Sequence, residues 1–262
     1  MPSSSASTTD GPAGLRARLE RGETLFGTFL NMGSPVSAEI CGRAGFDWLL
    51  VDLEHGSGWE GDLLNQLQAF ADTGAHPLVR VEANERPRFT KALDLGAEGI
   101  MVPRVDTAEE AARAAAHMRY PPAGVRGVAF MNRSYGFGTR PRDLEAANRR
   151  VVCIVQIESE TAVANAGAIA AVDGVDALFI GPSDLTQSMG ILGQTGHPRY
   201  AAAVEAVERA VKAAGKAAGV LLRAPEELDA YSARGFRLIG ISGDGAFLAA
   251  AARAALEGLR AR

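Results

Sequence analysis

Short runs of apolar residues alternate along this chain with segments whose apolar residues recur at helical spacing. Each run is nearly continuous, without the strict polar and apolar alternation of a half-exposed strand. Continuous apolar strands are buried on both faces, which is typical of a parallel sheet covered by helices. The pattern predicts eight strands, at residues 24–30, 46–55, 76–82, 99–105, 151–158, 176–181, 216–222 and 236–242.

The segments between these runs carry the signals of helices. Ser34 and Pro35 suit the start of a helix after the first run, and Thr107 and Glu110 have the spacing of a capping box after the fourth. Eight strand and helix units predict an α/β fold, a single (β/α)8 TIM barrel. An open doubly wound sheet is the alternative, but GTFLNMGS after the first run lacks the usual glycine fingerprint GxGxxG.

Composition fits one large globular domain. The chain has 262 residues, of which 47% are hydrophobic and 22% are charged, and α/β barrels commonly need about 250 residues. We therefore expect one catalytic barrel domain over residues 15–262, after a disordered tail at residues 1–14 that is rich in Ser, Thr and Gly. That tail lacks the apolar segment of a secretory signal. Cys41 and Cys153 are expected to be reduced core thiols.

Net charge and hydropathy bear on the partners. The formal charge is -4 at pH 7, so the chain offers no basic field to nucleic acid or to an anionic membrane. A small-molecule partner is therefore favoured. The sequence contains no run of about 18 apolar residues that would cross a membrane, and a cytoplasmic location is expected.

Polar residues collect where the predicted strands end. In a barrel, the active site is built at the carboxyl ends of the strands, so these residues are expected to meet at one rim. Asp52 and Glu54 share one face of their strand, and His55 faces the other way unless a turn begins there. The residues at the five polar strand ends are Asp52, Glu54 and His55; Arg80 and Glu82; Arg104; Gln156 and Glu158; and Gly181, Pro182, Ser183 and Asp184.

Glu158 and Asp184 end successive strands and are therefore expected to be neighbours on the rim. Two hard carboxylate ligands with room for water suit Mg²⁺ or Mn²⁺, whereas a closed zinc site requires His or Cys ligands. An acid and base pair of the glycosidase type is the alternative. Arg80 and the peptide from Gly181 to Ser183 are suited to hold an anion, although that peptide also reads as an ordinary helix cap.

One segment interrupts the regular alternation. Residues 119–143, RYPPAGVRGVAFMNRSYGFGTRPRD, form a connection rich in Pro, Gly and Tyr. Connections of this length in compact domains are usually functional or disordered. We therefore expect this segment to form a wall or a lid of the site.

The stretches GFDWLLVDLEHG, LVRVE, LDLGAEGIMVPRV, RYPPAGVRGVA, QIES and IGPSDL follow one another along the chain. With them the chain resembles the HpcH/HpaI aldolases, metal-dependent class II pyruvate aldolases that include 4-hydroxy-2-oxoheptanedioate aldolase and 2-dehydro-3-deoxyglucarate aldolase. The resemblance runs from about Gly27 to the end. It implies a (β/α)8 barrel and a homo-oligomer, a hexamer or trimer of dimers in which the last helix packs on a neighbouring subunit. It also implies a divalent cation, Mg²⁺ or Mn²⁺ with Co²⁺ as a substitute.

The resemblance further implies a role for each matching position. His55 would act as the base, and Arg80 would offset the charge that develops on an enolate. Asp94 is the acidic partner that the family pattern gives for His55, and Asp52 is the local candidate. The implied catalytic residues are His55, Arg80, Asp94 and Asp52; the substrate-binding residues are Gln156, Gly181, Pro182, Ser183 and Asp184; and the metal ligands are Glu158 and Asp184.

These implied roles describe an aldolase that forms or cleaves 4-hydroxy-2-oxo acids, with pyruvate or hydroxypyruvate as donor and an aldehyde as acceptor. No lysine lies at a predicted strand end, which argues against a Schiff base. An oxaloacetate-type decarboxylase or another lyase is an alternative, because a pocket that stabilises an enolate does not determine which bond is broken. A non-catalytic binder of 2-oxo acids is a second alternative.

The chain departs from the family pattern in one stretch. FMNRSYGFG (130–138) stands where many relatives carry a sequence close to ARASRWG. The resemblance therefore does not identify the aldehyde acceptor. The apolar side chains of this stretch would either line an acceptor pocket or pack beneath the loop. They are Phe130, Met131, Tyr135 and Phe137. Arg104 and Arg133 would either hold an acceptor carboxylate or be surface charges.

Overall fold

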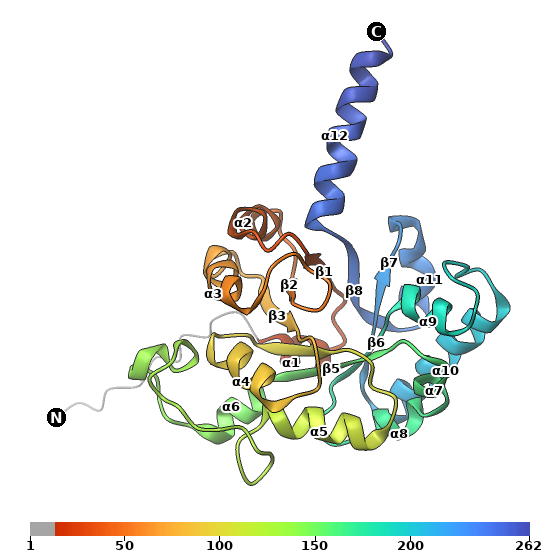
Figure 1. Ribbon diagram of the computed structural model, residues 1–262. Coiled ribbons are helices and arrows are strands. Elements are labelled where there is room, and N and C mark those ends of the chain that lie inside the picture. Colours follow the sequence, from red (N-terminus) through yellow and green to blue (C-terminus); the bar gives the residue numbers. More distant parts are fainter. Residues whose placement is uncertain (1–13) are drawn as a thin grey trace, which may run out of the picture.

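The computed structural model describes residues 14–262 and shows eight parallel strands closed into a barrel (Figure 1). Neighbouring strands are consecutive in the chain, and the first pairs with the last. The predicted single (β/α)8 TIM barrel is therefore confirmed, and the open sheet is excluded. The tail predicted to be disordered lies, except for Gly14, outside the described residues. The strands are β1 (Leu25–Leu30), β2 (Trp48–Asp52), β3 (His76–Arg80), β4 (Gly99–Val102), β5 (Val152–Ile157), β6 (Ala177–Ile180), β7 (Ala217–Leu222) and β8 (Phe236–Gly243).

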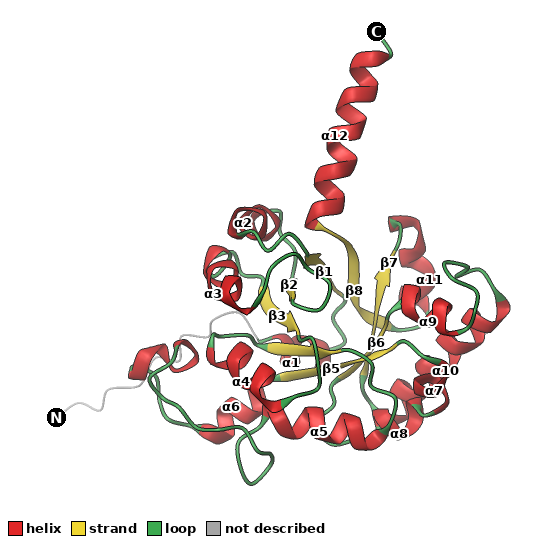
Figure 2. Cartoon of the chain, in the orientation of Figure 1, coloured by secondary structure: helices red, strands yellow, loops and turns green. Residues whose placement is uncertain are grey.

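Helices surround the barrel and connect its strands (Figure 2). The α-helices are α1 (Leu15–Glu20), α2 (Pro35–Arg43), α3 (Glu60–Ala69), α4 (Arg86–Asp94), α5 (Ala108–Met118), α6 (Leu144–Arg150), α7 (Glu160–Ala164), α8 (Ala166–Ala170), α9 (Pro182–Ser188), α10 (Pro198–Ala214), α11 (Leu228–Ala233) and α12 (Asp244–Arg260), with 3-10 turns at η1 (Arg133–Gly138) and η2 (Pro225–Glu227). The hydroxyl of Ser34 accepts a hydrogen bond from the backbone N–H of Ser37 and caps α2. The predicted capping box of Thr107 and Glu110 is present at the start of α5.

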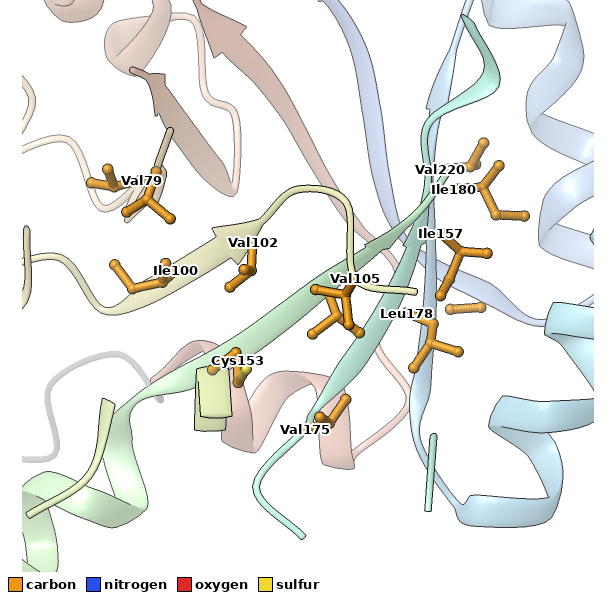
Figure 3. Close-up of a cluster of buried hydrophobic side chains, with 14 of the residues drawn as sticks. Val79, Ile100, Val102, Val105, Cys153, Ile157, Val175, Leu178, Ile180 and Val220 are labelled. Carbon is orange, nitrogen blue, oxygen red and sulfur yellow. The ribbon is translucent and has the colours of Figure 1, made fainter. Parts of the chain in front are cut away.

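The larger part of the core lies between the strands and the surrounding helices. Side chains that point outward from the strands, among them Ile100, Cys153 and Leu178, are buried in this layer (Figure 3). Side chains that point inward form a second buried cluster within the barrel. Because both faces are covered, every residue of β4, β5 and β6 is buried. This two-sided burial is the reason that the apolar runs in the sequence are continuous.

Aromatic side chains fill the middle of the barrel. The rings of Phe29, Trp48 and Phe179 lie with their centroids 6.3 to 6.5 Å apart. Gly27 on β1 faces Trp48 so closely that a Cβ atom there would lie 2.0 Å from the indole ring. Leu15 of α1 is buried in the same inner cluster. This short helix was not among the predicted elements, because six residues carry too little periodicity to identify it.

Both cysteines are buried free thiols, as the sequence predicts. Burial raises the pKa of the Cys41 thiol and that of the Cys153 thiol. The reactive thiolate form is therefore disfavoured at both positions. Over residues 14–262, the structure contains no helix with the length and apolar character needed to cross a membrane.

We expect Gly27→Ala to destabilise the barrel, because its methyl group would overlap the rigid indole of Trp48. Overpacking a core usually costs about 1–3 kcal/mol, and a fully buried ring leaves little room for relaxation. Gly167→Ala is the matched control, since Gly167 is an exposed residue of α8 with nothing near its Cβ position. Alanine there should stabilise the helix by about 0.5–1 kcal/mol. Denaturant unfolding measures both changes, and equal stabilities of the two variants would contradict this packing.

Candidate active site

A pocket of about 310 Å³ opens at the carboxyl ends of the strands. Its lining includes several residues predicted for the site, namely His55, Arg80, Gln156 and the segment from Gly181 to Asp184. The other lining residues are Phe29, Asn31, Phe179, Leu221, Ser242, Gly243 and Ala246. Residues from distant parts of the sequence therefore meet at one rim.

Arg80 and Asp52 form a buried ion pair between neighbouring strands. Arg80 donates from Nε to Oδ1 of Asp52 at 2.8 Å and from Nη2 to Oδ2 at 2.6 Å. Its Nη1 lies 3.3 Å from Oε2 of Glu54, and its guanidinium carbon lies 5.2 Å from the centroid of the Phe29 ring. A bidentate pair fixes the plane of a guanidinium as well as its charge. Asp52 thus sets the orientation of the cation in the pocket.

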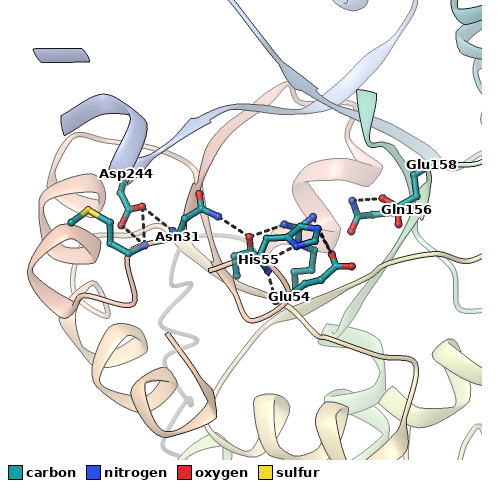
Figure 4. Close-up of polar contacts among 9 residues, drawn as sticks. Asn31, Glu54, His55, Gln156, Glu158 and Asp244 are labelled. Carbon is teal, nitrogen blue, oxygen red and sulfur yellow. Dashed lines mark hydrogen bonds and ion pairs between the residues drawn. The ribbon is translucent and has the colours of Figure 1, made fainter. Parts of the chain in front are cut away.

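A turn after β2 brings His55 to the same pocket (Figure 4). Oδ1 of Asp52 accepts hydrogen bonds from the backbone N–H groups of Glu54 at 3.1 Å and of His55 at 3.2 Å. An aspartate side chain that accepts hydrogen bonds from the N–H groups two and three residues later in the chain folds the backbone into a turn. Had β2 continued as a strand, His55 would face away from Asp52 and Glu54. Because the turn ends the strand alternation, the His55 side chain lines the pocket. Its imidazole remains 61% exposed.

The acidic group nearest the imidazole of His55 is Glu54. Its Oε2 lies 3.7 Å from Nε2 of His55, whereas the carboxylate of Asp52 is engaged by Arg80 and the backbone. In this structure Asp52 contacts the backbone N–H of His55 and not its imidazole. Burial raises the pKa of Glu54, against the opposing effects of Arg80 and His55.

Asp94 does not reach the pocket within the chain. It is the last residue of α4, and its Oδ1 accepts a hydrogen bond from Nη2 of Arg126 at 2.8 Å. A helix that follows a barrel strand runs back along the outside, so its last turn lies at the end of the barrel away from the pocket. The expected pairing of Asp94 with His55 therefore does not hold within one subunit.

Glu158 and Asp184 follow adjacent strands, β5 and β6, and Asp184 lies in the first turn of α9. Glu158 is buried. Its Oε1 accepts a hydrogen bond from the backbone N–H of Arg104 at 2.6 Å, and its Oε2 accepts one from Nε2 of Gln156 at 3.2 Å. These contacts hold the carboxylate at the edge of the pocket, opposite the His55 side in Figure 4.

Negative charge accumulates around Glu158. Burial raises the pKa of Glu158 to about 7; the hydrogen bond from the Arg104 backbone lowers it, and the charges of Asp184 and Glu54 raise it. The positive charge of Arg80 lowers this pKa and is the smallest of these effects. A cation bound beside these neighbouring carboxylates would stabilise their ionised forms.

The space beside Glu158 is kept open by Gly181. A Cβ atom at this position would lie 3.0 Å from Oε2 of Glu158. Next to it, Oε1 of Gln156 is buried without a hydrogen-bond partner, as expected where water, an ion or a ligand completes a site. Residues 14–262 contain no cluster of three or more His, Cys, Asp or Glu side chains that would enclose a metal ion. The carboxylates of Glu158 and Asp184 would thus leave most coordination positions to other ligands.

Arg104 contributes its backbone to the site. Its φ of 53° lies in the left-handed region, which a non-glycine residue rarely adopts. This conformation accompanies the short hydrogen bond from its N–H group to Glu158, and strained residues of this kind concentrate at functional sites. The side chain of Arg104 is exposed and is not part of the pocket lining.

Residues 119–143 form neither a wall nor a lid of this pocket within the chain, contrary to expectation. They lead from α5 to α6, which precedes β5, and a connection from helix to strand lies at the amino end of a barrel. Arg133 donates hydrogen bonds to the carbonyl oxygens of Leu95 at 2.9 Å and Leu67 at 3.4 Å, at the ends of α4 and α3. Arg133 is therefore neither a free surface charge nor a pocket residue.

The apolar residues of this connection also lie away from the pocket. Tyr135 is buried, and the ring of Phe130 packs edge-on against it at a centroid distance of 5.0 Å. Met131 and Phe137 are exposed. The apolar wall of the pocket comes instead from the barrel strands, through Phe29, Phe179 and Leu221.

Three strands whose carboxyl ends carry no charged residue also contribute to the site. Asn31 after β1, Leu221 of β7 and Ser242 of β8 all line the pocket. The signal that identifies such residues is their place on the inward face at the carboxyl end of a strand, whatever their charge. A search of the sequence for charged residues alone does not identify them.

Three comparisons with known proteins place this geometry in context. The sequence profile described as HpcH/HpaI aldolase/citrate lyase matches residues 25–251. The chain is 42% identical to 2-dehydro-3,6-dideoxy-6-sulfogluconate aldolase of Pseudomonas putida, over 93% of this chain and 96% of that protein. It is 41% identical to 5-keto-4-deoxy-D-glucarate aldolase of Salmonella paratyphi C, over 91% of this chain and 93% of that protein.

A solved structure has the same fold over almost the whole length. The crystal structure of an HpcH/HpaI aldolase/citrate lyase family protein from Burkholderia cenocepacia superposes with a TM-score of 0.90 at 41% identity. The superposition covers 94% of this chain and 98% of that one. The similarity thus extends over the barrel and the pocket alike.

We expect Glu158→Gln to change how the stability of the metal-free protein depends on pH. The pKa of Glu158 is higher in the folded protein than its ordinary value of 4.5. The folded state therefore holds the proton more tightly, and the stability that this gives is lost as pH rises from about 4.5 to about 7. Shifting one group by this amount is worth at most about 3 kcal/mol. Glutamine removes the titration, so the free energy of unfolding should fall less between pH 4.5 and 8.

Denaturant unfolding in the presence of a chelator measures this slope. Glu145→Gln is the matched control, because Glu145 is an exposed residue of α6 and should leave the wild-type slope unchanged. A Glu158→Gln protein with the wild-type pH dependence would show that burial does not raise the pKa of this carboxyl group.

Proposed function

Because this chain belongs to the HpcH/HpaI aldolase/citrate lyase family, it is a carbon–carbon lyase of the aldolase type, and we propose that it acts on 4-hydroxy-2-oxo acids through a 2-oxo acid enolate. Pyruvate or hydroxypyruvate is the proposed donor, and an aldehyde is the acceptor. The observation that carries this proposal is the meeting of Asp184, Arg80 and His55 around one pocket, with Glu158 hydrogen-bonded to the lining residue Gln156 at its edge.

Glu158 and Asp184 are the proposed ligands of a divalent cation, Mg²⁺ or Mn²⁺, for which Co²⁺ would substitute. Carboxylate oxygens are the ligands that these hard cations prefer. The raised pKa of Glu158, the space kept by Gly181 and the unpartnered Oε1 of Gln156 all fit a cation with water and substrate oxygens around it. When bound, such an ion supplies a Lewis acid that makes the protons beside the ketone of the substrate more acidic.

His55 is the proposed base for one of these protons. Its imidazole is exposed to the pocket, and an imidazole accepts and returns protons near neutral pH. Glu54, with Oε2 3.7 Å from Nε2 of His55, is the acidic group next to the ring. The imidazolium that results from the transfer would return the proton in the reverse direction. Glu54 therefore takes the supporting role that the sequence resemblance gives to Asp94 or Asp52.

Arg80 is proposed to offset the negative charge that develops on the substrate. Asp52 already fixes its guanidinium, so little reorganisation is needed when the charge appears. One such donor is commonly worth about 3 kcal/mol of transition-state stabilisation. Gln156 and the segment from Gly181 to Ser183 line the space between Arg80 and the carboxylates and are the proposed substrate contacts.

The size of the pocket favours small substrates. A volume of about 310 Å³ lies at the lower end of the usual range for ligand sites. A three-carbon 2-oxo acid with a short aldehyde would fit such a space. The curated relatives named above are aldolases of deoxy sugar acids, and we propose that the acceptor here is of comparable polarity.

We also propose that the protein is a homo-oligomer and that α12 joins its subunits. Figure 1 shows this helix extending away from the barrel. Every residue of α12 from Ala246 onward is exposed, including Leu248, Leu256 and Leu259. These leucines share one face at helical spacing, and an apolar stripe of this kind usually covers another protein surface. A second copy of the chain is the proposed partner, in a hexamer or trimer of dimers.

The metal proposal is tested by following exchange of the methyl protons of pyruvate with D₂O and aldol addition to a small aldehyde. Both reactions should require Mn²⁺ or Mg²⁺ and stop when EDTA is added. Glu158→Gln and Asp184→Asn should each lower the rates by about two orders of magnitude or more, whereas Glu145→Gln should not. Activity that survives EDTA would contradict the metal role.

The same assay separates the alternatives. Faster release of pyruvate from oxaloacetate than from an aldol would identify a decarboxylase. Metal-dependent binding of oxalate in titration calorimetry, without turnover of any kind, would identify a non-catalytic binder.

The oligomer proposal is tested by replacing two leucines of the exposed stripe. Leu248→Glu with Leu259→Glu should reduce the mass measured by light scattering, because charges are costly in a buried apolar interface. Arg253→Gln, on another side of the same helix, is the control and should leave the mass unchanged. A wild-type protein that is monomeric at micromolar concentration would refute the proposal directly.

A further inference from the structure

A buried carboxylate at the start of α12 holds the end of β1. Oδ1 of Asp244 accepts hydrogen bonds from the backbone N–H groups of Asn31 at 2.8 Å and Met32 at 3.2 Å. Its Oδ2 accepts one from the hydroxyl of Ser37 at 2.6 Å. Only 5% of Asp244 is exposed. The segment after β1 is therefore fixed by a residue from the other end of the chain.

Asn31, held in this way, reaches the ion pair in the pocket (Figure 4). Its Nδ2 donates a hydrogen bond to Oδ2 of Asp52 at 2.7 Å. The same oxygen accepts the hydrogen bond from Nη2 of Arg80 at 2.6 Å. The contacts thus run from Asp244 through Asn31 and Asp52 to the guanidinium of Arg80.

The backbone around Asn31 is shaped to allow this contact. A Cβ atom on Gly243 would lie 2.3 Å from Oδ1 of Asn31, so any larger residue there would displace the amide. Ser242, directly before it, has a φ of 53° in the left-handed region. Strain of this kind persists only where surrounding contacts maintain it. The end of β8 is therefore fitted to the side chain of Asn31.

We propose that Asn31 and Asp244 are positioning residues that hold Asp52, and through it the guanidinium of Arg80, in the orientation used by the reaction. The proposal rests on the proposed function for its kinetic consequence. Glu54 gives it a physical basis, because its Oε2 lies 3.3 Å from Nη1 of Arg80 and competes with Asp52 for the cation. The amide of Asn31 fixes Asp52 and so favours the bidentate pair.

Loss of the Asn31 amide removes one of the two hydrogen bonds that hold Oδ2 of Asp52 and lets Arg80 move toward Glu54. Arg80 then no longer points at the position where negative charge develops, and Glu54 is drawn away from His55. A misplacement of this kind lowers the rate of the chemical step more than it weakens ground-state binding. Asn31 makes no hydrogen bond to the proposed metal ligands Glu158 and Asp184, so these two residues should stay in place.

The kinetic test uses Asn31→Ala, and Asn84→Ala as the matched control. The amide of Asn84 also donates to an oxygen, the carbonyl of Glu110, but it has no contact with the pocket. In the full-length protein with Mn²⁺, Asn31→Ala should lower kcat for pyruvate methyl exchange by about 10- to 100-fold. The KM for pyruvate should change less than about 3-fold, and Asn84→Ala should resemble the wild type.

Asn31→Asp should be at least as impaired as Asn31→Ala, because a carboxylate beside Asp52 repels it and competes for Arg80. Asp244→Asn should have a smaller effect, since one acceptor oxygen remains for the backbone. In the double variant with Asn31→Ala, Asp244→Asn should add no further loss, because both residues act through the same contact. Additive losses of kcat in the double variant would overturn the proposal that Asp244 acts through Asn31.

A second readout does not depend on activity. In the metal-free protein, the Nε–H group of Arg80 should give a protected NMR signal, identified by its absence from an Arg80→Lys protein. This signal should shift and exchange faster with solvent in Asn31→Ala, and should be unchanged in Asn84→Ala. If Asn31→Ala does not fold, Asp244→Asn serves for both measurements.

The outcomes separate this proposal from the proposed function. A wild-type protein without exchange activity would refute the proposed function, and the NMR signal would then decide whether Asn31 positions Arg80. An active wild type with an Asn31→Ala variant within 2-fold of it in kcat, or with an unchanged Arg80 signal, would overturn the positioning role alone.

Discussion

Closure of the barrel within its ring of helices buries most strand residues on both faces, and this constraint determines where the polar residues of the strands can lie. An inward side chain near the middle of a strand has only other side chains around it, and aromatic rings such as Phe29 and Trp48 fill that space. At the carboxyl end the same inward face opens to the pocket. Polar groups there must pair with one another, as Arg80 does with Asp52, or await a ligand.

The pocket combines two electrostatic environments. On one side, the cation of Arg80 is compensated by Asp52 and fixed in orientation. On the other side, Glu158 is buried close to further carboxylates, and the pKa of its carboxyl group rises to about 7. A 2-oxo acid would bring oxygen atoms to both sides at once. This asymmetry is the physical basis for assigning charge stabilisation to Arg80 and cation binding to Glu158 and Asp184.

The direction of the chain divides the molecule into two ends with different tasks. Connections from strand to helix build the pocket, whereas connections from helix to strand gather at the other end. Asp94 and the connection 119–143 belong to that second end, where Arg126 and Arg133 of the connection donate hydrogen bonds to Asp94 and Leu95 at the end of α4. The match to the aldolase family extends over the whole barrel. The wall of the pocket, in contrast, is made by particular residues at the ends of β1, β6, β7 and β8.

The sequence by itself determined the eight strands, their order and the rim at which Arg80, Gln156 and Asp184 meet, because apolar runs and strand ends are local features. Only the tertiary structure decided that Glu54 is the acid beside His55, since a turn held by Asp52 reverses the alternation of the strand. It also decided that Asp244 supports Asn31, a residue 213 positions away in the chain. Hydrogen bonds over such separations depend on how the barrel closes, and no local pattern in the sequence records them.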